Sequence, residues 1–135
     1  MTEPAAMTRE DAQQLLDTCD IHKDFGLALV EWQHGHATFT FRAPASVRAG
    51  DAGLIHGGAL ATALDTAACF AVIAAVGVDC STIDLRTDFL RPAGAEELSV
   101  VGTCLRAGRR FAVADANVIA PDGKLVATAR GTFTW

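Results

Sequence analysis

The fold is decided by residues 55–75, which read IHGGALATALDTAACFAVIAA. After its two glycines this stretch is rich in Ala and Leu, which are strong helix formers, and no proline or glycine interrupts it before Gly77. Its residues are apolar on nearly every side, so we expect one long helix that is buried all round. About 20 apolar residues could also span a bilayer, but the charge of Asp65 at the centre and the predicted strands downstream argue against that.

Asp65 is the single charged residue of this predicted helix. A buried carboxylate without a partner is costly, so Asp65 needs either a partner or a chemical use. Two other interpretations remain open. Asp65 could be a structural hydrogen-bonding group, the usual role of a lone buried polar residue, or it could face solvent, which fits so apolar a sequence poorly.

The start of the helix offers a second feature. The first backbone N–H groups of a helix have no partner inside it, and the helix dipole there favours negative charge. Because Gly57 and Gly58 carry no side chain, a carbonyl oxygen could approach these N–H groups closely, as in an oxyanion hole. Gly57 and Asp65 are separated by about 12 Å along a helix axis at ~1.5 Å per residue. One helix cannot bring both to the same carbon atom. If both act on the same substrate, a second subunit must bring its helix alongside, which links catalysis to dimerisation as a hypothesis.

Composition limits the class of protein. With 135 residues, half of them hydrophobic, the chain can bury the core of a single domain. The net charge of -5 gives no reason to expect nucleic acid or a membrane as a partner. The four cysteines show no Cys-x-x-Cys pair, and the first residues lack the basic start and apolar core of a secretory signal. We therefore expect a cytoplasmic protein with reduced thiols.

The flanking segments predict a short helix and a sheet. Residues 1–7 are interpreted as a loose tail, and Thr8 with Asp11 is an N-cap signal for a helix whose apolar face extends to Cys19. Residues 25–32 and 37–42 predict a hairpin across His34-Gly35, and residues 43–54 a loop. His34 and His36 have no acid or cysteine close in sequence, so no metal site is predicted. Further strands are expected over residues 81–90, 98–105, 111–119 and 125–134, the first with Ile83, Leu85 and Phe89 on an apolar face.

This order predicts an α+β architecture in which one antiparallel sheet curls round one helix. With these features the chain resembles the hotdog-fold acyl-CoA thioesterases of the phenylacetic-acid-degradation (PaaI-like) type. The resemblance covers residues 24–135, after an N-terminal tail and short helix in residues 1–23. Its motifs are residues 53–58 (GLIHGG) followed by Asp65, residues 81–85 (STIDL) with 89–93 (FLRPA), and residues 122–127 (DGKLVA).

The resemblance implies a hotdog fold, with an antiparallel sheet wrapped around one long central helix. It also implies sheets joined edge to edge in a homodimer, and dimers that pair into tetramers. The implied reaction is hydrolysis of an acyl-CoA thioester to the free acid and CoA, with no cofactor, since CoA is part of the substrate. The sequence does not specify the acyl group.

Residue roles follow from matching positions. The Gly57 N–H would bind the thioester oxygen, and Asp65 of the neighbouring subunit would act as nucleophile or as the base that activates water. His56 would orient the thioester or the loop beside it, and Thr82 would hold the water or the acid. Many relatives carry Asn or Gln six residues before the histidine, where this chain has Gly50. Asp51 beside it is therefore the candidate replacement.

Binding of CoA requires cations, because CoA carries several phosphates and this chain is acidic. The candidates are Arg91 and the pair Arg109-Arg110 at a predicted tight turn, followed by Arg86, Arg106 and Lys124. The predicted substrate-binding set is Gly58, Asp51, Arg91, Arg109 and Arg110. Two alternatives remain open: an acyl-CoA binding protein without activity, and a hotdog hydratase or dehydratase. No Gly-x-Ser-x-Gly motif is present, so a serine hydrolase is not predicted.

Overall fold

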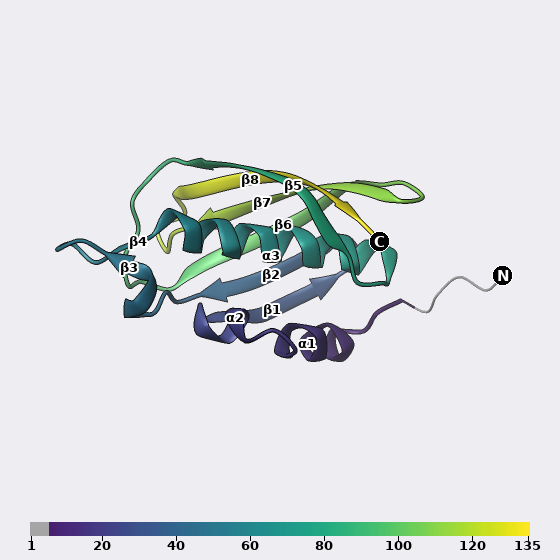
Figure 1. Cartoon of the computed structure of the whole chain (residues 1–135), viewed down its shortest axis with the longest axis horizontal. Coiled ribbons are helices and arrows are strands. Elements are labelled where there is room, and N and C mark those ends of the chain that lie inside the picture. The colour runs from purple at the N-terminus through teal and green to yellow at the C-terminus, as the bar shows by residue number, and fades with distance from the viewer. Residues whose placement is uncertain (1–5) are drawn as a thin grey trace.

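The computed structural model describes residues 6–135 and shows one long helix, α3, packed across a six-stranded antiparallel sheet (Figure 1). The strand order is β1-β2-β6-β7-β8-β5. Two short helices precede the sheet, and a 3-10 turn with a two-stranded hairpin precedes α3. The elements are α1 (Arg9–Asp17), α2 (Asp20–Asp24), β1 (Leu27–Gln33), β2 (His36–Phe41), a 3-10 turn (Ala45–Val47), β3 (Arg48–Ala49), β4 (Leu54–Ile55), α3 (Gly57–Val76), β5 (Ser81–Phe89), β6 (Leu98–Ala107), β7 (Phe111–Ile119) and β8 (Leu125–Thr134).

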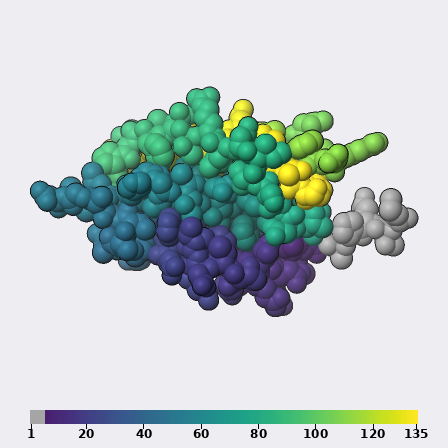
Figure 2. Space-filling view, in the orientation of Figure 1, coloured from purple at the N-terminus to yellow at the C-terminus, as the bar shows by residue number. Residues whose placement is uncertain are grey.

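The long helix forms where the composition predicted it, and it ends at Gly77, whose φ of 81° is left-handed. Length and apolarity alone would let α3 cross a membrane, but most of it is buried within this fold, so it is the core helix. The prediction that it is buried all round is wrong. Gly58, Thr62, Asp65 and Cys69, spaced three or four residues apart, form a partly exposed stripe. Figure 2 shows α3 at the surface in a band between the N-terminal helices and β5.

Small residues let the sheet approach α3 closely. Gly102 in β6 lies directly against the backbone of Ala67, and a Cβ atom at position 102 would stand 2.0 Å from the Ala67 carbonyl oxygen. The alanines of α3 are thus matched by a glycine on the facing strand. Apolar side chains fill the space on either side, among them Phe39, Phe41, Leu64, Ile73 and Phe133.

Replacing Gly102 by Ala is expected to destabilise the protein by about 1–3 kcal/mol, because the added methyl group must push strand and helix apart. Urea unfolding of the purified variant measures this. The outward-facing neighbour provides the control: Thr103→Ala is expected to change the unfolding free energy by about 0.5 kcal/mol or less. Equal stability of Gly102→Ala and wild type would contradict the close packing.

The two edges of the sheet are finished differently. At the β1 edge, α2 packs alongside and Arg9 of α1 donates hydrogen bonds to the carbonyl oxygens of Leu29 and Val30. At the other edge lies β5, where Ile83 and Phe89 are 52% and 51% exposed. Of the apolar face predicted for this strand, Leu85 packs against the core, whereas Ile83 and Phe89 are not covered within one chain. Exposed edge strands with apolar side chains are sites of pairing with another chain.

The hairpin β1–β2 was predicted correctly: Gln33 pairs with His36 across a two-residue turn in which Gly35 has a φ of 72°. The N-terminal capping box of Thr8 and Asp11 is also present. The helix that follows is shorter than expected, however. It ends at Asp17, and Cys19 is exposed and precedes the second helix, α2. The tail predicted for residues 1–7 lies mostly outside the described residues, which begin at residue 6.

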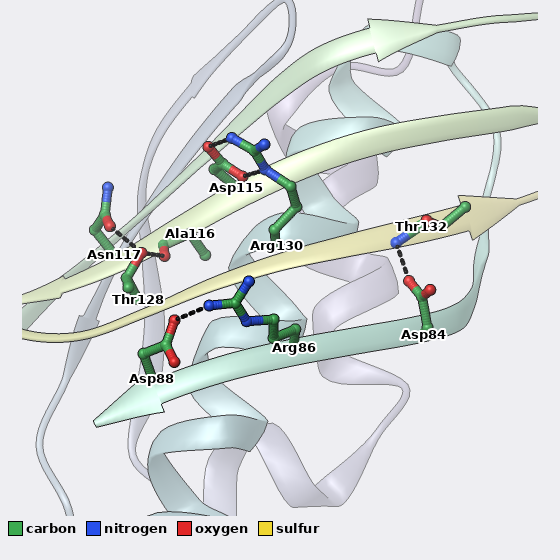
Figure 3. Close-up of polar contacts among 9 residues, drawn as sticks. All are labelled: Asp84, Arg86, Asp88, Asp115, Ala116, Asn117, Thr128, Arg130 and Thr132. Atoms are coloured by element: carbon green, nitrogen blue, oxygen red, sulfur yellow. Dashed lines mark hydrogen bonds and ion pairs between the residues drawn. The ribbon is translucent and has the colours of Figure 1, made fainter. Parts of the chain in front are cut away.

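The sheet face opposite α3 is polar, and its charges pair with one another (Figure 3). Arg130 donates two hydrogen bonds to Asp115, at 2.7 and 2.9 Å, and this contact raises the pKa of Arg130. Arg86 pairs with Asp88 at 3.2 Å. Asp84 accepts a hydrogen bond from the backbone N–H of Thr132 at a bulge in the β5–β8 ladder. These exposed pairs add little stability, but they give Arg86 and Arg130 carboxylate partners.

Candidate active site

The first turn of α3 leaves one backbone donor open. His56 is the N-cap, and its Nδ1 accepts a hydrogen bond from the Gly58 N–H at 2.9 Å. The N–H groups of Ala59 and Leu60 donate to the His56 carbonyl oxygen. Within residues 6–135 the Gly57 N–H has no hydrogen-bond partner. His56 therefore completes the cap and leaves Gly57 as the amide that can receive an oxyanion.

A cavity of about 330 Å³ opens at this amide. The loop after β5 forms one wall, and the ring of Phe89 lies 3.5 Å from the point where a Gly57 side chain would begin. Two backbone hydrogen bonds of 2.8 Å fix the approach to the helix: Ile55 N–H donates to Ala93, and His56 N–H donates to Val47. The lining residues are Leu54, Ile55, Gly57, Leu60, Phe89, Leu90, Arg91, Pro92 and Ala93.

Asp65 faces a second cavity, of about 200 Å³. Its Oδ1 accepts a hydrogen bond from the Thr82 hydroxyl at 2.7 Å, which ties the middle of α3 to the beginning of β5. No hydrogen bond to Oδ2 is found within residues 6–135. The cavity is lined by Leu15, Thr18, Cys19, His22, Asp65, Thr66, Cys69, Phe70, Asp79 and Thr82. Asp65 is thus held in place by one oxygen, and the other is available for chemistry.

Gly57 and Asp65 line different cavities of the same chain. This separation agrees with their expected spacing of about 12 Å along the helix. One chain therefore carries the open amide and the positioned carboxylate at two separate places. Both places lie next to β5. Phe89, at one end of the strand, lies beside Gly57, and Thr82, near the other end, holds Asp65.

The other predicted binding residues are more dispersed. Arg91 lines the Gly57 cavity, whereas Asp51, Arg109 and Arg110 are exposed and do not line either cavity in the described chain. Asp51 lies in the turn between β3 and β4, in a segment interpreted from the sequence as a simple loop. Arg109 and Arg110 lie in the β6–β7 turn, at the end of the sheet where α3 ends rather than where it begins (Figure 1).

Sequence reasoning missed part of the Asp65 cavity. The N-terminal helices, interpreted as edge packing without chemistry, contribute Leu15 and His22 to its wall. The His22 ring is held by a 2.9 Å contact of its Nδ1 with the Leu16 carbonyl oxygen and packs edge-on against Phe70. Helical spacing placed Leu15 on an inward face, but no sequence signal connects it with Asp65. Within residues 6–135, no three His, Cys, Asp or Glu side chains gather as metal ligands would.

An antiparallel sheet wrapped around one long apolar helix is the hotdog fold. A profile of the thioesterase superfamily matches residues 52–127, which include Gly57, Asp65 and Thr82. The chain belongs to this superfamily. The predicted fold class, the resemblance to PaaI-like thioesterases and the prediction of an enzyme are confirmed.

Individual relatives agree with the family. The medium/long-chain acyl-CoA thioesterase YigI of Salmonella typhimurium is 28% identical to this chain, in an alignment that covers 96% of this chain and 97% of YigI. The PaaI protein from the phenylacetic acid degradation operon of E. coli superposes with a TM-score of 0.85 at 25% identity, over 93% of this chain and 90% of PaaI. A mutant PaaI from Thermus thermophilus gives a TM-score of 0.77 at 26% identity, over 86% and 98% of the two chains.

Proposed function

We propose that this chain hydrolyses acyl-CoA thioesters to the free acid and CoA, at a site that two subunits build together. The observations that carry the proposal are the Gly57 N–H, which has no hydrogen-bond partner within residues 6–135, and the Asp65 carboxylate held by Thr82. Thioester hydrolysis requires stabilisation of an oxyanion and an activated oxygen nucleophile, which these two groups supply. The names of the YigI relatives support an acyl-CoA as the substrate.

The exposed edge of β5 provides the route to a dimer. Two copies of β5 can pair antiparallel about an axis at Arg86, which places the partner's bulged segment Thr82–Ile83 opposite Phe89. Since Phe89 touches Gly57 and Thr82 holds Asp65 within each chain, this register brings the partner's Asp65 toward the Gly57 amide. It also covers Ile83 and Phe89, whose exposure in a single chain is otherwise costly. We also propose that two such dimers pair into a tetramer.

In this arrangement the thioester oxygen accepts the Gly57 N–H, at the positive end of the α3 dipole. The free oxygen of the partner's Asp65 either takes a proton from the attacking water or attacks the thioester carbon itself. Negative charge then develops on the oxygen bound to Gly57, and the tetrahedral species collapses with release of the CoA thiolate. In the water route this collapse gives the free acid, and the proton held by Asp65 passes to the thiolate. In the direct route it gives an anhydride with Asp65, which water then hydrolyses to the free acid and the restored carboxylate. His56 contributes by capping the helix, because its bond to Gly58 keeps the first turn intact.

Arg91 lines the Gly57 cavity and is the first candidate for the phosphates of CoA. An antiparallel β5 pairing also carries the partner's β6–β7 turn to the end of the sheet where α3 begins, so Arg109 and Arg110 stay candidates as residues of the neighbouring subunit. Asp51 lies in the loop between β3 and β4, and the N–H of Gly58 is bonded to the N-cap residue His56. We propose that the reaction uses no metal or organic cofactor and takes place in the cytoplasm.

A panel of purified acyl-CoAs tests the function, with aromatic, medium-chain and long-chain acyl groups, and with release of CoA as the measurement. We expect hydrolysis of at least one class with a kcat/KM in the usual enzymatic range of about 10⁴ M⁻¹s⁻¹ or more. Asp65→Asn serves as the control for contaminating hydrolases. Saturable binding of acyl-CoA without turnover across the whole panel would contradict the proposal and indicate a binding protein instead.

A further inference from the structure

Two cysteine thiols lie in contact beside Asp65. Cys69 follows Asp65 by one turn of α3, and Cys80 precedes Thr82 by two residues at the start of β5. The two Sγ atoms are 2.9 Å apart, and each also lies 3.5–3.6 Å from the backbone carbonyl oxygen of the other cysteine. The thiol pair therefore forms a second bridge from α3 to β5, next to the hydrogen bond between Thr82 and Asp65.

We propose that Cys69 and Cys80 form a reversible disulfide, and that this disulfide lowers the thioesterase activity by displacing Thr82 and Asp65. The oxidant is a low-molecular-weight disulfide of the glutathione type. The effect on activity rests on the proposed function, whereas the disulfide itself does not. The two cysteines are 11 positions apart in the sequence, and only the packing of α3 against the beginning of β5 brings them into contact.

The geometry couples the thiols to the carboxylate. Asp65 and Cys69 are four residues apart on one helix and so share a face, and Cys80 and Thr82 are two residues apart on an extended segment and so point to the same side. A disulfide holds its sulfur atoms at about 2.05 Å, closer than two thiols in contact. Forming it moves the start of β5 relative to α3 at the point where Thr82 holds Asp65. A misplacement of ~1 Å near reacting groups can cost about 100-fold in rate.

The chemical step is a thiol–disulfide exchange. The hydrogen bond with Cys80 raises the pKa of the Cys69 thiol, as do its burial and the nearby carboxylates of Asp65 and Asp79. The exchange balances with either cysteine as the first nucleophile, and Cys80 is taken first. Its thiolate attacks one sulfur of the oxidant and releases one thiol, and the Cys69 thiolate then attacks the Cys80 sulfur and releases the second. Two protein thiols are oxidised, one external disulfide is reduced, and the two thiol protons pass to the released thiols.

The other two cysteines are competitors that an experiment must separate. Cys19 is exposed and borders the same cavity as Cys69. Cys104 lies half-buried on β6, and burial raises its pKa. In the described chain neither sulfur lies in hydrogen-bond contact with another sulfur. A double variant, Cys19→Ser with Cys104→Ser, therefore retains only the proposed pair.

The test uses the full chain, incubated with oxidised glutathione and afterwards with dithiothreitol. Intact mass and a peptide map follow the thiols, and acyl-CoA hydrolysis is followed by loss of the thioester, because a thiol reagent would react with the protein. We expect a loss of two hydrogen atoms, a cross-linked peptide containing Cys69 and Cys80, and a fall in kcat of about tenfold or more. Dithiothreitol should reverse all three, in the wild type and in the double variant alike.

Cys80→Ser is the matched variant, which should form no cross-link and keep the same kcat before and after oxidant. Absence of the Cys69–Cys80 cross-link in the double variant, or a glutathione adduct on both cysteines instead, would overturn the disulfide. A complete cross-link with unchanged kcat would overturn its effect on the enzyme. If the reduced protein hydrolyses no acyl-CoA, the proposed function fails, and the mass and peptide map still decide whether the disulfide forms.

Discussion

Replacement of Asp65 by Asn is expected to lower kcat by about 10²- to 10⁴-fold, the range that general-base side chains contribute. The amide has the shape of the carboxylate, and its oxygen can still accept the hydrogen bond from Thr82 that the structure shows at 2.7 Å. It can neither take a proton from water nor attack a thioester. The fold and the binding of acyl-CoA should therefore be retained. Steady-state kinetics measure kcat and KM, and thermal unfolding measures the stability of the fold.

A matched control removes the same charge elsewhere. Asp88 lies on the polar outer face of the sheet, paired with Arg86, so Asp88→Asn is expected to leave kcat within about twofold, in line with the small contributions of exposed ion pairs. Normal turnover by Asp65→Asn would remove Asp65 from the mechanism. A large loss in both variants would indicate a general effect on the assembly rather than on the chemistry.

Replacement of Gly57 by Pro is expected to lower kcat by about 10²- to 10³-fold, the cost of losing one oxyanion donor. Position 57 is the first residue of α3, where proline is well tolerated. The residue before it is also compatible, because His56 has φ -62° and ψ 135°, the extended conformation that a following proline favours. The substitution therefore removes the N–H group with little disturbance of the helix.

Gly57→Ala isolates the role of that N–H group. It keeps the donor and adds a methyl group 3.5 Å from the ring of Phe89, an ordinary contact distance. Because the methyl group enters the cavity, we expect a higher KM with most of kcat retained, whereas the proline variant should lose kcat. Steady-state kinetics of the two variants side by side provide the measurement. Equal losses of kcat would show that space, not hydrogen bonding, matters at this position.

Local patterns predicted much of the fold. The hairpin at Gly35 and strands β7 and β8 follow from turn residues and alternation, and the boundaries of α3 follow from its composition. These local patterns do not predict which strands are neighbours in the sheet. The strand that begins at Ser81 lies at the sheet edge beside β8, and β6, the next strand in the chain, pairs with β2 and β7. Short elements such as β3 and β4 carry too few residues for a periodic signal.

The separation of Gly57 and Asp65 along the helix was predicted from the sequence, and the two residues line different cavities. That Gly57 binds an oxyanion, and that a second subunit brings Asp65 near it, stays a prediction. The role of His56 as N-cap could not be predicted, because histidine is not among the usual N-cap residues. In the structure its Nδ1 accepts the hydrogen bond from the Gly58 N–H. The contact between Cys69 and Cys80 depends on tertiary packing, and the exposure of Phe89 becomes meaningful only once the edge of the sheet is known.

The most direct test of the shared site mixes the two inactive variants. Asp65→Asn and Gly57→Pro subunits are combined under conditions of verified subunit exchange, and hydrolysis of an acyl-CoA is measured. In a two-fold symmetric dimer, half of the mixed dimers are heterodimers with one intact site each, so activity should recover to about one quarter of the wild-type value. If Asp65 and Gly57 of the same chain acted together, no heterodimer would hold an intact site, and the mixture would stay as inactive as its parents.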